Sequence, residues 1–94
     1  IDRIMQATQF DIRRPKHAWA GLRSFVADGE MVIGWDTQTP RFLWVAAQGG
    51  YGIQSAYGYS LLARNLALNE PLAPVLQQQG VQPSALSPQR LQKP

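Results

Sequence analysis

The sequence has no cysteine and only one histidine, His17, among its 94 residues. The lack of cysteine excludes disulfide bonds, thiolate zinc sites and cysteine nucleophiles, and a single histidine cannot form a multi-histidine metal site. No apolar run approaches the roughly 20 residues that span a bilayer, and no basic-then-apolar signal peptide opens the chain. We therefore expect no metal site, no transmembrane segment and a cytoplasmic location.

Charge is scarce as well. Charged residues make up 16% of the sequence, against about 25% in typical soluble domains. The net charge of +3 is modest, and the positive residues are scattered apart from Arg13, Arg14 and Lys16, so we expect no nucleic-acid partner. Few charged residues are available for the surface, and the chain begins at Ile1. We therefore expect that this chain is a piece of a longer protein and that the rest of that protein covers part of its surface.

The chain is expected to form a small α/β fragment of the α+β kind, organised in three parts. Residues 1–16 are predicted to be the end of a helix and a linker, and residues 17–70 form the main unit. Residues 71–94 are rich in proline and glutamine, which is typical of an extended tail with short helical turns.

Turn signals divide the main unit into short elements. Asp28 and Gly29 lie between two apolar runs and favour a type I′ turn, which predicts a short hairpin on either side of them. A second turn at residues 37–40 precedes a continuous apolar run at 42–47, which is typical of a strand buried on both faces. A charge-poor helix is expected over residues 53–68.

A glycine-rich turn at residues 49–52 joins that strand to that helix. Exposed backbone N–H groups and the helix dipole make such a turn an acceptor for negative charge. The spacing comes near the dinucleotide fingerprint G-x-G-x-x-G, but Ser55 stands at the third glycine position and Glu70 precedes a proline instead of ending a second strand. We therefore reject the fingerprint, and the motif alone favours a turn that only connects strand and helix.

Arg23 is the second candidate for chemistry, because it lies among apolar and small neighbours in a predicted strand. A buried arginine needs an anionic partner, and its planar fork binds a carboxylate through two parallel hydrogen bonds. An arginine on the solvent-exposed face of an edge strand would need no such partner. The residues alone leave both interpretations open.

Five segments in one order and spacing resemble the C-terminal end of the FAD-dependent D-amino-acid oxidase and glycine oxidase family. The similarity covers roughly residues 17–74, and the segment 86–91 is similar to chain ends in bacterial members. The five segments are Trp19-Ala-Gly-Leu-Arg-Ser-Phe25, Asp28-Gly29, Val32-Ile-Gly34, residues 42–47, and Gln48-Gly-Gly-Tyr-Gly-Ile-Gln54.

The resemblance implies a flavoprotein oxidoreductase that transfers a hydride from the Cα atom of an amino acid or related amine to flavin N5 and gives an imine. It implies that Arg23 binds the substrate carboxylate and that Gly50 and Tyr51 lie near the substrate. Ser24 stands where glycine oxidases often have proline. The flavin-binding positions that it implies are Gly49, Gly50, Tyr51, Gly52, Ile53 and Gln54, and no residue of this chain is predicted to be catalytic.

Members of the family bind the dinucleotide half of FAD through an N-terminal βαβ unit that these 94 residues lack. We therefore expect the partner of this chain to be the FAD-binding part of the same protein, and the chain alone to be inactive and to self-associate through exposed apolar surface. The alternative hypothesis is a non-catalytic module that binds a small anion or nucleic acid. It rests on the sequence pI of about 9.8, the basic cluster and the glycine turn. A structural domain without a ligand is a third interpretation.

Overall fold

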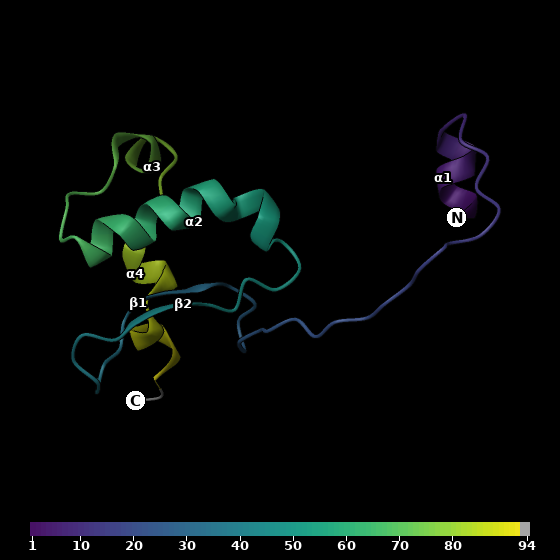
Figure 1. Ribbon diagram of the computed structural model, residues 1–94. Coiled ribbons are helices and arrows are strands. Elements are labelled where there is room, and N and C mark those ends of the chain that lie inside the picture. Colours follow the sequence, from purple (N-terminus) through teal and green to yellow (C-terminus); the bar gives the residue numbers. More distant parts are fainter. Residues whose placement is uncertain (93–94) are drawn as a thin grey trace.

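The computed structural model describes residues 1–92, which form a small α+β fold of one antiparallel two-stranded sheet and four α-helices (Figure 1). The predicted fold class is therefore confirmed. The elements are α1 (Asp2–Ala7), β1 (Val32–Trp35), β2 (Leu43–Ala46), α2 (Gly52–Ala67), α3 (Pro74–Gln78), α4 (Pro83–Leu86) and the 3₁₀ helix η1 (Pro88–Leu91). Within the described residues, no helix has the length and apolar character that crossing a membrane requires.

The hairpin of the fold is formed by β1 and β2, which pair from Val32 opposite Ala46 to Trp35 opposite Leu43. The turn between them is organised by Asp36. Its carboxylate accepts hydrogen bonds from the backbone N–H groups of residues 38 and 39, at 3.0 and 2.6 Å, and from the Trp44 indole at 2.8 Å. These donors, the indole first, lower the pKa of Asp36 from 3.8 to about 2.

The hairpin predicted around Asp28 and Gly29 is wrong. Those residues do form a turn, closed by a hydrogen bond from Gly29 N–H to the Val26 carbonyl at 2.9 Å, but residues 17–26 form no strand. A type I′ turn needs positive φ at both central positions, and of the pair only Gly29 has it, at 77°. The turn therefore redirects the chain without pairing the segments on either side.

Residues 42–47, which were expected to form a strand buried on both faces, are only partly buried. Residues 32–34 of β1 are buried, whereas Trp44 and Val45 of β2 are each 39% exposed. The reason is that α2, α4 and η1 all contact β1, so the sheet is covered mainly along that strand. The apolar run is the outer strand of the hairpin.

The core lies between β1 and the helices that follow it. Its buried members are Met31, Ile33, Leu62 and Leu76. Leu62 comes from α2, whose bounds agree within one residue with the predicted helix, and Leu76 comes from α3. The tail, which was expected to be extended with only short helical turns, forms the short helices α3, α4 and η1 and contributes Leu76 to the core. Residues 93 and 94 of the predicted tail lie outside the described residues.

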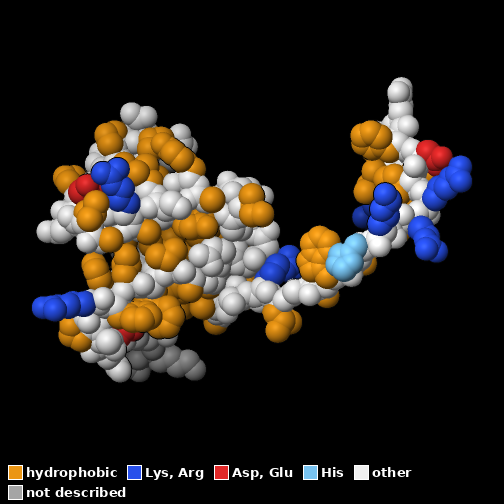
Figure 2. All heavy atoms as spheres, in the orientation of Figure 1, with side chains coloured by type: hydrophobic (Ala, Val, Ile, Leu, Met, Phe, Trp, Pro, Cys, Tyr) orange, Lys and Arg blue, Asp and Glu red, His pale blue; other side chains and the backbone are white. Residues whose placement is uncertain are grey.

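The N-terminal arm, residues 1–25, extends away from the remaining described residues, 26–92, which we call the body (Figure 1). The radius of gyration is 18.2 Å, compared with about 12 Å for a compact chain of this length. The arm begins with α1, as predicted, and exposes 84% of Trp19 and all of Leu22. Figure 2 shows apolar side chains on both arm and body. The expected exposed apolar surface is present, and self-association through it stays a prediction.

Candidate functional site

Arg23 and the glycine-rich turn line one open hollow of about 450 Å³. The structure thus brings together every residue to which the resemblance assigns a substrate- or flavin-binding role, although Arg23 belongs to the arm and the others belong to the body. The lining residues are Arg23, Gly49, Gly50, Tyr51, Gly52, Ile53 and Gln54.

Two glycines allow the arm to lie against the turn. A Cβ on Gly50 would stand 2.6 Å from the Arg23 Nη1 atom, and one on Gly49 would stand 2.8 Å from the Phe25 ring. Gly49 also has a φ of 56°, and its N–H donates to the Ser24 carbonyl at 3.1 Å. The close approach of arm and turn therefore depends on the absence of side chains at both positions.

Arg23 itself is exposed and lies outside any strand. The predicted strand that would contain Arg23 is therefore wrong, and neither of the two interpretations left open, a buried strand arginine or an arginine on an edge strand, describes it. Among residues 1–92 its guanidinium has neither a hydrogen-bond nor an ion-pair partner. It remains available to a ligand that enters the hollow.

The other wall of the hollow is the start of α2. Its N-cap residue, Tyr51, makes no capping hydrogen bond, and the first turn contains no acidic side chain. Within the described chain, the backbone N–H groups of Gly52, Ile53 and Gln54 have no hydrogen-bond partner. Such a helix end carries a partial positive charge, which adds to that of Arg23 and favours an anionic or electron-rich ligand.

Tyr51 is held in place through its hydroxyl, its ring and its backbone carbonyl. Its hydroxyl donates to the Gly29 carbonyl at 2.8 Å, and its ring packs against the core. Its own carbonyl accepts a hydrogen bond from the Ser55 hydroxyl at 2.6 Å. The phenol is therefore already engaged, and Tyr51 contributes the shape of the hollow rather than a free hydroxyl.

The basic cluster that supported the alternative hypothesis lies elsewhere. Arg13, Arg14 and Lys16 are exposed on the arm, and Arg13 stands 3.8 Å from Asp11 in a solvent-exposed pair. His17 stacks on Trp19 in the same segment, with ring centroids 5.8 Å apart. None of these residues lines the hollow.

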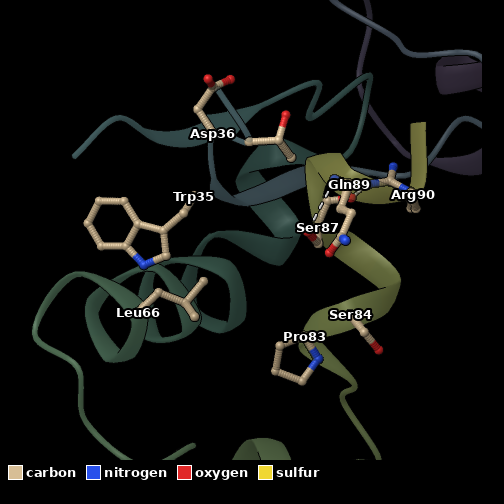
Figure 3. Close-up of a pocket in the computed structure, with 9 residues that line it drawn as sticks. Trp35, Asp36, Leu66, Pro83, Ser84, Ser87, Gln89 and Arg90 are labelled. Atoms are coloured by element: carbon tan, nitrogen blue, oxygen red, sulfur yellow. Dashed lines mark hydrogen bonds between the residues drawn. The ribbon is translucent and has the colours of Figure 1, made fainter. Parts of the chain in front are cut away.

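A larger hollow of about 740 Å³ lies between the end of β1, α2 and the C-terminal segment (Figure 3). Its charged groups already have partners within the protein. Asp36 is engaged in the hairpin turn, and the Arg90 guanidinium binds the Asp28 carboxylate, which lowers the pKa of Asp28. No local pattern in the sequence indicates the pair of Arg90 and Asp28, because the two residues lie far apart in the chain.

No protein-family model matches the sequence. The resemblance to the D-amino-acid oxidase and glycine oxidase family therefore rests on the five quoted segments. Two of them form the strands of the sheet, and residues 49–54 of a third line the smaller hollow. Gly29 accepts the hydrogen bond from the Tyr51 hydroxyl, and the segment that contains Trp19 approaches the hollow through Arg23 and Phe25.

Proposed function

We propose that this chain is part of an FAD-dependent oxidoreductase of the D-amino-acid oxidase and glycine oxidase family that oxidises an amino acid or a related amine. One observation carries the proposal. The arginine and the glycine turn, which the resemblance assigns to substrate and flavin respectively, line the same hollow, and neither the guanidinium nor the first N–H groups of α2 have partners among residues 1–92.

The residues at the turn suit one edge of a flat, electron-rich ring. Gly50 and Gly52 have no side chains that would block its approach, and the free N–H groups at residues 52–54 would donate hydrogen bonds to carbonyl or ring-nitrogen acceptors. When bound, FAD would supply the acceptor for the hydride that leaves the substrate. The protein's part is to hold that acceptor and to favour negative charge near the helix end.

Arg23 would bind and orient the substrate. Its fork donates two parallel hydrogen bonds to a carboxylate, which fixes both the distance and the direction of the atoms attached to it. Orientation of this kind can contribute a large share of a rate. Because Arg23 is exposed in this chain, its ion pair becomes strong only when further protein covers the hollow and excludes water.

The test uses the full-length protein that carries these residues. We expect it to contain flavin, seen by its visible absorbance, and we expect amino acids to bleach that absorbance under anaerobic conditions. Arg23→Ala should raise the KM by about 10- to 100-fold, the loss typical of a hydrogen bond to a charged group. Arg14→Ala removes the same charge from the exposed arm and should leave the KM unchanged.

Two results would contradict the proposal separately. A protein without flavin or bleaching would exclude the oxidoreductase, and an unchanged KM in Arg23→Ala would remove Arg23 from substrate binding. If flavin is absent but carboxylate or phosphate binds in a manner that Arg23→Ala abolishes, the hollow is a small-anion site. The unpaired guanidinium and the free helix end would serve that function equally well.

A further inference from the structure

Arg90 ties the C-terminal 3₁₀ helix to the turn at residues 28–30. Its Nε donates to Asp28 Oδ2 at 2.7 Å and its Nη2 to Oδ1 at 3.0 Å, which makes the pair bidentate. Its Nη2 also donates to the Glu30 carbonyl at 3.1 Å, and its Nη1 donates to the Ser87 carbonyl at 3.1 Å. The side chain is only 15% exposed. Three directed hydrogen bonds thus fix the guanidinium against the turn at 28–30, and the fourth joins it to its own C-terminal segment.

The same turn holds the wall of the smaller hollow. Gly29 lies between the two residues that Arg90 binds, and its carbonyl accepts the hydrogen bond from the Tyr51 hydroxyl at 2.8 Å. Tyr51 is the N-cap of α2 and directly follows Gly50, over which the Arg23 guanidinium lies. A continuous set of contacts therefore runs from Arg90 through the turn at 28–30 to the hollow.

We propose that Arg90 is a positioning residue for the hollow formed by Arg23 and the glycine turn. It holds the turn at 28–30, that turn holds the Tyr51 hydroxyl, and Tyr51 sets where α2 and its free N–H groups begin. What the hollow binds rests on the proposed function, but the connection from Arg90 to Tyr51 does not. The fork geometry is essential, because a lysine ammonium would keep the charge and lose the bidentate arrangement.

Hydrogen exchange measured by mass spectrometry on the full-length protein tests this connection without any ligand. The backbone N–H groups of Gly29, Gly49 and Tyr51 are hydrogen-bonded and therefore report on the two turns. Arg90→Lys should make exchange about 10- to 100-fold faster at both turns, the factor expected for loss of charged hydrogen bonds. Tyr51→Phe should have this effect only at residues 48–54.

A double variant distinguishes positioning from general stabilisation. Because the two residues act in series, Arg90→Lys combined with Tyr51→Phe should exchange at residues 48–54 no faster than Tyr51→Phe alone. Arg64→Lys is the matched control, since Arg64 of α2 forms an exposed pair at 3.3 Å with Glu70, which follows the helix, and it should change neither turn.

The outcomes separate this proposal from the proposed function. Faster exchange confined to residues 26–31 in Arg90→Lys, or an equal acceleration throughout α2 and the core, would overturn the positioning role. In a protein that oxidises amino acids, Arg90→Lys should raise the KM by about 3- to 10-fold with little change in kcat. A protein without flavin would contradict the proposed function and leave the exchange result as the measure of the connection.

Discussion

The two sides of the smaller hollow are held in very different ways. The glycine turn leads into a 16-residue helix and is fixed by the Tyr51 hydroxyl to the turn at 28–30. Arg23 arrives on an arm that joins the turn through one backbone hydrogen bond, from Gly49 to Ser24, and through the contact of Phe25 with Gly49. The body of the protein forms one wall of the hollow. The arm forms the other wall by lying against the body.

This difference shows that the buried core and the exposed Arg23 belong to different parts of the chain. The body contains the whole buried core, while none of residues 1–25 is buried. Burial of apolar surface supplies most of the free energy of folding. The body therefore carries most of the stability of the structure, and the arm carries Arg23, none of whose neighbours within residues 1–25 is buried.

The largest expected contrast is between two leucines. Leu62→Ala removes a side chain that is 1% exposed in the core and should reduce the free energy of unfolding by about 2–5 kcal/mol. Leu22→Ala removes a fully exposed side chain of the arm and should change it by less than about 0.5 kcal/mol. Urea unfolding of the 94-residue chain, followed by circular dichroism, measures both. Equal losses would show that the arm belongs to the cooperative core.

Gly34 and Gly50 differ in what an added Cβ atom would meet, and the expected energies are smaller. A Cβ at Gly34 would stand 2.8 Å from the Pro88 ring and 3.3 Å from the backbone of Ser87, so Gly34→Ala should cost about 1–3 kcal/mol of stability. A Cβ at Gly50 would meet only the end of the Arg23 side chain. Because that side chain can move, Gly50→Ala should cost less than about 0.5 kcal/mol.

The same glycine pair should behave in the opposite order when binding is measured. In the full-length protein, Gly50→Ala displaces the guanidinium from the turn, so the KM for a carboxylate substrate should rise by about 10-fold, corresponding to the loss of one charged hydrogen bond. Gly34→Ala lies outside the hollow and should leave the KM unchanged. A KM that rises in Gly34→Ala and not in Gly50→Ala would place the arginine elsewhere.

The parts of the structure that could be predicted from the sequence are those with local signals. The glycine turn, the charge-poor helix after it and the turn near residues 37–40 each follow from neighbouring residues, and α2 and the hairpin turn lie where these signals put them. The candidate site residues come from the resemblance and stay predictions, and the structure places them around one hollow. The strand that was predicted to contain Arg23 does not form, and the exposure of Arg23 depends on contacts that no local pattern specifies.

The remaining features depend on partners that no local spacing specifies. Asp28 and Gly29 have the composition of a hairpin turn, but the strand that would pair across them does not form, and the Asp28 carboxylate binds Arg90 instead. Leu76 of the tail likewise packs into the core, a contact that no local spacing in the sequence specifies. Such contacts are decided by tertiary packing, which overrides local preference.

The smallest expected contrast between body and arm is in their response to acid. Hydrogen bonds from the Trp44 indole and from two backbone N–H groups lower the pKa of Asp36 from 3.8 to about 2, and the Arg90 fork lowers that of Asp28. A carboxylate with a lowered pKa in the folded state adds stability above its unfolded pKa and loses that contribution as the pH falls through its folded pKa. The body should therefore lose stability between about pH 4 and pH 2.

Thermal unfolding measured from pH 6 to pH 2 checks this response. Asp36→Asn should lower the Tm at pH 6, because the neutral amide is a weaker acceptor for the three donors, and should flatten the fall in Tm toward pH 2. Asp11→Asn is the matched change on the arm, where the pair with Arg13 is long at 3.8 Å and exposed, so its Tm profile should follow that of the unaltered chain. A profile as steep in Asp36→Asn as in the unaltered chain would mean that the hairpin turn does not depend on the charged carboxylate, and the acid sensitivity would then have to come from the Asp28 and Arg90 pair.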